Sequence, residues 1–109
     1  MIHLELLPQD VREKLPELYA HEELGLAAQA LVKLFTPDSS WTWYCSSFDG
    51  HDICFGLVIG FEPEFGYFSV RELESVRGPL GLPIERDLHF EPKSLEELRD
   101  HYQEKGYAM

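Results

Sequence analysis

Apolar residues recur along this chain with two different periods, and the two periods predict its helices and strands. Steps of three and four between apolar residues predict a short first helix from Pro8 to Lys14, which Pro16 ends. Two Ser-x-x-Glu capping boxes predict a middle helix that starts at Ser69 and a last helix that starts at Ser94. Alternating segments rich in aromatic and β-branched residues predict strands at 31–36, 41–48, 53–60, 65–68 and 84–90.

The order of these elements predicts the fold class. Runs of strands joined by short turns favour an antiparallel sheet. We therefore expect an α+β fold, with an antiparallel sheet of four to five strands and short helices packed mainly on one face. Apolar residues are spread over the whole length without repeats or a linker, so residues 1–109 are expected to form a single domain.

The pair Asp49-Gly50 lies between the two clearest strands and is typical of a type I′ hairpin. With these two residues as the loop, paired positions sum to 99, which places Cys45 opposite Cys54 and Trp43 opposite Gly56. The cysteines then become direct cross-strand neighbours, and Gly56 leaves space for the Trp43 ring. Both faces of this hairpin are apolar, so we expect it to be covered at least in part on both sides.

Composition narrows the classes of function. The chain carries 20 acidic against nine Lys and Arg residues, a formal charge of −11. This charge repels phosphate and anionic lipid, so direct binding of nucleic acid or of a membrane surface is disfavoured, while a basic protein partner remains compatible. The sequence has no long apolar run and no signal-peptide pattern, so a cytoplasmic location is expected.

No catalytic motif is present, and an enzyme is the less favoured class. Two cysteines nine residues apart do not form a zinc signature, so no metal and no cofactor are predicted. The thiols are expected to be reduced and buried, and a cross-strand disulfide under oxidising conditions is the alternative. The densest group of charges surrounds the loop 78–83. These charges form either structural ion pairs or a contact for an anion or a partner. Within this group Arg86 is expected to be half-buried and paired with a carboxylate, because it shares an apolar strand face with Ile84 and Leu88.

Several segments resemble one uncharacterised bacterial family. They are Phe-Thr-Pro-Asp-Ser-Ser-Trp-Thr-Trp-Tyr at 35–44, Phe-Gly-Leu-Val-Ile-Gly-Phe-Glu at 55–62, Phe-Gly-Tyr-Phe-Ser at 65–69 and Glu-Leu-Glu-Ser-Val-Arg-Gly-Pro-Leu-Gly-Leu-Pro-Ile-Glu-Arg-Asp at 72–87. The similarity spans about residues 7 to 100. It is a single-domain family of unknown function found on plasmids, phages and integrated mobile elements. The resemblance implies a small accessory protein of mobile DNA and brings no catalytic residues.

Two hypotheses follow for the function. The first is a small acidic interaction protein, an accessory or inhibitor protein that binds a basic surface of a nucleic-acid-processing or defence protein. The alternative is a small enzyme or ligand-binding domain with a site around Arg77, Glu85 and Asp87. The residues expected to contact a partner are an aromatic residue that follows a polar turn and seven charged residues: Trp41, Glu74, Arg77, Glu85, Asp87, Glu96, Glu97 and Asp100.

Overall fold

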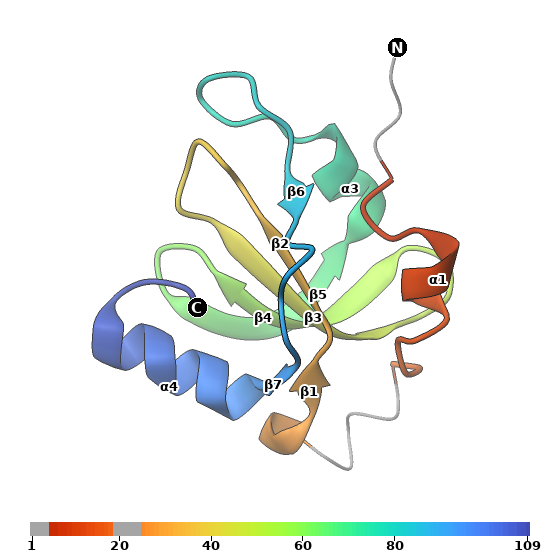
Figure 1. Ribbon diagram of the computed structural model, residues 1–109, viewed down its shortest axis with the longest axis horizontal. Coiled ribbons are helices and arrows are strands. Elements are labelled where there is room, and N and C mark those ends of the chain that lie inside the picture. Colours follow the sequence, from red (N-terminus) through yellow and green to blue (C-terminus); the bar gives the residue numbers. More distant parts are fainter. Residues whose placement is uncertain (1–4, 19–24) are drawn as a thin grey trace.

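A five-stranded antiparallel sheet forms the frame of the computed structural model, which describes residues 5–18 and 25–109 (Figure 1). The sheet has the order β5-β4-β3-β2-β6. Its strands are β2 (Val32–Phe35), β3 (Thr42–Phe48), β4 (Ile53–Ile59), β5 (Pro63–Ser69) and β6 (Glu85–Arg86). A second sheet pairs β1 (Gln29–Ala30) with β7 (Lys93–Ser94). The predicted α+β class and antiparallel sheet are confirmed.

The helices begin where the capping residues predict. The Ser69 hydroxyl accepts the Glu72 N–H at 3.1 Å at the start of α3 (Val70–Ser75). The Ser94 hydroxyl accepts the Glu97 N–H, also at 3.1 Å, at the start of α4 (Leu95–Lys105). These bonds satisfy N–H groups that the first helical turn leaves without a partner.

Two further helical segments among the described residues are short. The first helix, α1 (Gln9–Arg12), stops two residues before the predicted end, because the chain tightens into three-residue turns such as Lys14 N–H to Val11 carbonyl at 3.1 Å. A single 3₁₀ turn, η1 (Gly25–Ala27), precedes β1.

Two hydrophobic cores lie on opposite faces of the sheet, because successive side chains of a strand point to opposite sides. Trp43 and Cys45 belong to the first core, with residues of α3 and of the segment leading into α1. Tyr44 belongs to the second core, with Leu95 and Leu98 of α4. All seven residues of β3 are buried. The expectation that the hairpin is covered on both sides is therefore confirmed, with two helices on one face and α4 on the other.

The predicted register of the β3-β4 hairpin is wrong. Cys45 pairs with Gly56, while Phe48 pairs with Cys54, and a bulge at Ser46 separates the two registers. The Ser46 hydroxyl donates to the Phe55 carbonyl at 3.1 Å across this bulge. For Trp43 and Cys45, the observed partner lies two residues further along β4 than the predicted one. Because a shift by an even number of residues does not change the face of a strand, both residues keep the face that the alternation predicts.

The loop between β3 and β4 explains this displacement. One carboxylate oxygen of Asp49 accepts the N–H groups of His51 and Asp52 at 2.7 Å and of Ile53 at 3.0 Å. This side chain organises a four-residue loop, 49–52, in place of a two-residue turn. Gly50 within it has a φ of 87°, which suits glycine.

The loop also supports the start of α3. Asp52 accepts the Ser69 hydroxyl at 2.6 Å and the Arg71 N–H at 2.8 Å. Although partial desolvation raises the pKa of Asp52, the Ser69 hydroxyl and the Arg71 N–H lower it, and the net direction is downward. The loop therefore joins the hairpin to the helix through one carboxylate.

The cysteines are not directly opposite, and this part of the prediction is wrong. Both are buried and free, and the Cys45 thiol donates to the Ser47 carbonyl at 3.3 Å. Burial, followed by the neighbouring Cys54, raises the pKa of the Cys45 thiol. Gly56 does not make room for the Trp43 ring: a Cβ there would enter the Tyr44 carbonyl, so glycine permits a close backbone approach beside the bulge.

The predicted strand 84–90 is also wrong beyond Arg86. The carboxylate of Asp87 accepts the His89 N–H at 2.9 Å and turns the chain out of the sheet. Leu88 is 72% exposed as a result, although its alternation with Arg86 resembles a strand. In contrast, β5 starts earlier than predicted, at Pro63, which the edge position allows.

Candidate functional site

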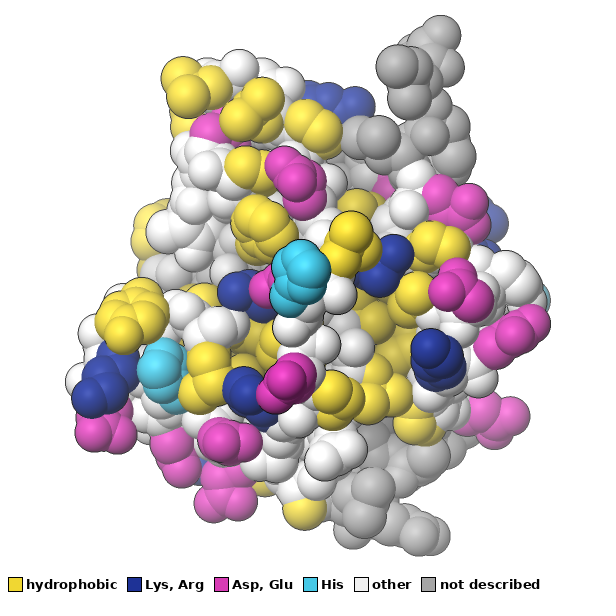
Figure 2. Space-filling model, in the orientation of Figure 1, with side chains coloured by type: hydrophobic (Ala, Val, Ile, Leu, Met, Phe, Trp, Pro, Cys, Tyr) yellow, Lys and Arg dark blue, Asp and Glu magenta, His cyan; other side chains and the backbone are white. Residues whose placement is uncertain are grey.

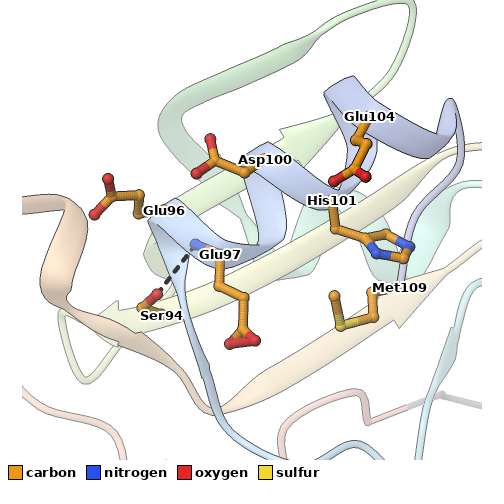
Figure 3. Close-up of a pocket in the computed structure, with 7 residues that line it drawn as sticks. All are labelled: Ser94, Glu96, Glu97, Asp100, His101, Glu104 and Met109. Carbon is orange, nitrogen blue, oxygen red and sulfur yellow. Dashed lines mark hydrogen bonds between the residues drawn. The ribbon is translucent and has the colours of Figure 1, made fainter.

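The acidic residues of α4 gather around one shallow hollow (Figure 3). Steps of four place Glu96, Asp100 and Glu104 along one side of the helix, about 6 Å apart per step. Glu97 and His101 extend the same surface, and Ser94 and Met109 complete the lining. The hollow has a volume of about 520 Å³. The structure therefore brings together three of the predicted contact residues, Glu96, Glu97 and Asp100, and adds a fourth carboxylate.

The charge of this surface is only partly compensated. Asp100 lies 3.2 Å from the Arg99 guanidinium, and Glu104 lies 3.8 Å from the Lys105 ammonium group. Glu96 and Glu97 are exposed and have no cationic partner among residues 5–18 and 25–109. They stand in the first helical turn, where the helix dipole favours negative charge. The surface, which we call the α4 acidic face (Glu96, Glu97, Asp100 and Glu104), consequently keeps a net negative charge.

The other charged residues of the prediction are not brought to one place. Glu74 accepts the Leu6 N–H at 2.9 Å and ties the N-terminal segment to α3. The Arg77 guanidinium donates to the carbonyl groups of Glu74 at 3.1 Å and Val76 at 2.8 Å, at the end of the same helix. Asp87 lies 3.8 Å from Lys33, and Glu85 is exposed on the edge strand β6. Local structural contacts thus account for Glu74, Arg77 and Asp87.

Trp41 is half-buried in an aromatic cluster. Its ring stacks on Trp43 at a centroid distance of 6.0 Å and meets the edge of Phe61 at 5.6 Å. A Cβ on Gly60 would come within 2.5 Å of the same ring, so the glycine makes room for it. Phe61 is 90% exposed and is the cluster's most accessible ring. Sequence reasoning did not single out Phe61 as a neighbour of Trp41, because that contact depends on the hairpin register.

Arg86 is half-buried, as predicted, but the predicted carboxylate partner is missing from the part of the chain that the structure describes. Its side chain instead lines a cavity between α1 and the segment after β6. Sequence reasoning missed this cavity because its walls come from segments far apart in the chain.

Two further observations concern binding chemistry. The described residues contain no group of three or more His, Cys, Asp or Glu side chains placed to hold a metal ion. Among these same residues, no helix combines the length and the apolar character needed to cross a membrane.

One family model matches the chain. The model, described as "Protein of unknown function (DUF2958)", matches residues 6–106. No curated protein and no solved structure shows significant similarity to the chain.

Proposed function

The chain belongs to the DUF2958 family, whose function is unknown, and from this premise we propose that it is a small acidic interaction protein. Its partner would be a protein with a basic surface, and the contact would centre on the α4 acidic face. The finer proposal is that the partner processes nucleic acid or acts in host defence. In that case the chain is an accessory or inhibitor protein of mobile genetic elements.

The observation that carries this proposal is the α4 acidic face itself. A capped helix of 11 residues holds four carboxylates around one hollow, and two of them have no cationic partner among the described residues. A row of exposed carboxylates on one helix complements the charge of a basic groove, which favours fast and specific association. A surface of this kind can compete with the phosphates that a basic groove otherwise binds.

The finer proposal depends on the resemblance to proteins of plasmids, phages and integrated elements. An inhibitor from such an element gains by occupying a nucleic-acid site with carboxylates. The charge of −11 supports this role, because the protein itself is repelled by the nucleic acid.

The alternative function has weaker support. A small enzyme or ligand-binding domain with a site around Arg77, Glu85 and Asp87 would need these side chains to converge. Arg77 binds carbonyl groups at the end of α3, and Asp87 lies beside Lys33. A ligand that contacts all three would have to displace these local contacts.

The test begins with a partner captured from host lysate and then purified. Association and dissociation rates are measured with the wild type and with the triple variant Glu96→Lys, Glu97→Lys, Asp100→Lys. We expect association to slow by about tenfold or more at low salt, with a smaller change in dissociation. Raising the salt concentration should weaken wild-type binding, because exposed charges are screened over about 8 Å at physiological ionic strength.

A second triple variant separates the α4 acidic face from net charge. Glu62→Lys, Glu64→Lys and Glu91→Lys alter exposed carboxylates outside α4 and change the net charge by the same amount. Equal slowing by both triple variants would contradict the assignment to α4. Affinity independent of salt, or a gel shift of DNA or RNA by the protein alone, would contradict the proposal as a whole.

A further inference from the structure

We propose that the cavity between α1 and residues 86–92 binds a small carboxylate with an apolar body. The cavity has a volume of about 260 Å³ and lies beside β2. It is separate from the α4 acidic face, with which it shares no lining residue. The inference therefore stands independently of the proposed protein partner.

Two cationic side chains that lack an ion-pair partner among the described residues line the cavity. The half-buried Arg86 and the exposed Lys14 both line it, and neither forms an ion pair within residues 5–18 and 25–109. These are two of only nine Lys and Arg residues in a chain of charge −11. A guanidinium presents a fixed fork of donors that fits a carboxylate with two parallel hydrogen bonds. The local charge thus favours an anion where the rest of the molecule repels one.

The remaining walls are mostly apolar. They come from three parts of the chain: α1, the junction of β1 and β2, and the segment that leaves β6. The apolar lining residues are Val11, Leu31, Val32, Leu88, Phe90 and Pro92. Figure 2 shows hydrophobic side chains exposed between these segments, with Lys or Arg side chains close by. Such walls bury an aliphatic chain or a ring but leave a second charge on the ligand unpaired.

Asp87 also lines the cavity and sharpens the choice of ligand. One of its oxygens accepts the His89 N–H at 2.9 Å, and the other lies 3.8 Å from the Lys33 ammonium group. Both oxygens of Asp87 therefore have partners other than Arg86. Because Asp87 itself lines the cavity, its negative charge disfavours a ligand with two negative charges, such as phosphate. The volume is also slightly below the usual range of ligand pockets, about 300–1,000 Å³, which limits the ligand to one ring or a short branched chain.

Nuclear magnetic resonance of the ¹⁵N-labelled full chain provides the test. The probes are 4-methylpentanoate and phenylacetate, with 4-methylpentanamide and phenylacetamide as uncharged counterparts. We expect saturable shifts of the backbone amides of Val11, Val32 and Phe90 with the carboxylates. The two uncharged probes should bind at least about tenfold more weakly than the carboxylates, which corresponds to a loss of at least about 1.4 kcal/mol in binding free energy.

Variants assign the binding to the cavity. Arg86→Met keeps the length of the side chain, and it should remove the preference for carboxylate over amide. Val11→Phe should fill the cavity and weaken both kinds of probe, which keeps the test decisive if Arg86→Met does not fold. Arg71→Met, which alters an exposed arginine outside the cavity, should bind as the wild type does. Absence of saturable shifts with both carboxylates, or an unchanged preference in Arg86→Met, would overturn the proposal.

Discussion

Asp38 joins two loops that are distant in the sequence. One of its carboxylate oxygens accepts the N–H groups of Leu80 at 2.8 Å and Leu82 at 3.3 Å. Gly78 lies against the same carboxylate, and a Cβ built on it would enter the carboxylate oxygens. The absence of a side chain at Gly78 is therefore what allows the loop 78–82 to close on Asp38.

Gly78→Ala should destabilise the protein for this reason. We expect a loss of about 1–3 kcal/mol in the free energy of unfolding, the usual cost of forcing extra atoms into a packed site. Urea denaturation measures this loss. Gly66→Ala is the matched control, because a Cβ at Gly66 meets nothing within 4 Å and should change the stability by less than about 0.5 kcal/mol. Equal effects of the two substitutions would contradict the steric explanation.

Single residues were predictable where the local pattern determines their surroundings. The half-burial of Arg86 follows from its apolar neighbours in sequence, and the structure confirms it. The missing carboxylate partner could not be predicted, because it depends on where the chain turns after Asp87. The role of Asp49 was equally hidden, since Asp-Gly is compatible with both a two-residue turn and a carboxylate that gathers several N–H groups.

At the scale of elements, the loop 49–52 makes the junction between hairpin and helix sensitive to acid. Partial desolvation raises the pKa of Asp49. The N–H groups of Asp52, His51 and Ile53 together lower it by more than this, so the net shift is downward. The pKa of Asp52 is lowered as well. Because the folded state binds these protons less tightly than the unfolded state, both groups stabilise the fold above about pH 4. That contribution disappears as the pH falls through the lowered values.

The variants Asp49→Asn and Asp52→Asn should test this acid sensitivity. At neutral pH each should be less stable than the wild type, because an amide accepts N–H groups less strongly than a carboxylate does. The difference should narrow as the pH falls below about 4. Urea unfolding at several pH values measures it, and Glu62→Gln, at an exposed residue, should follow the wild type throughout. A difference that stays constant with pH would contradict the explanation.

Elements with strong local signals were predicted best. The capping boxes determined the starts of α3 and α4, and Gly106, whose φ of 79° suits glycine, ends α4. The short strands were harder, because a two-residue strand such as β6 is determined by its neighbour β2 rather than by its own alternation. For the hairpin residues before the bulge, the face was more predictable than the cross-strand partner, since a displacement by two residues changes the partner and preserves the face. Beyond the bulge the alternation is broken, and Phe48 lies in the core of Trp43 and Cys45.

For the whole molecule, the dominant feature is its net charge of −11. Many carboxylates stand close together on a compact chain with a radius of gyration of 13.2 Å. Mutual repulsion destabilises the compact state, and salt reduces that repulsion. An increase from about 0.01 M to about 0.15 M shortens the screening length from about 30 Å to about 8 Å.

The midpoint temperature of thermal unfolding should therefore rise by a few degrees as the salt concentration increases over this range. The variant with lysines at Glu62, Glu64 and Glu91 carries less negative charge and should show a smaller shift. Equal shifts in the two proteins would indicate that the salt acts through something other than net charge.

The α+β class was predictable from the element order, whereas the assembly of separate segments around a cavity was not.

The burial of all seven β3 residues has an evolutionary consequence. A strand that serves two cores has no solvent-facing side on which sequence can drift, and each change must suit the packing above or below it. Substitutions in β3 should be accepted only together with compensating changes in helix α4 or in the α1 and α3 layer, according to the face concerned. The edge strand β5 is not packed on both faces in this way. Among related chains, β5 should therefore change faster than β3, although both strands pair with β4.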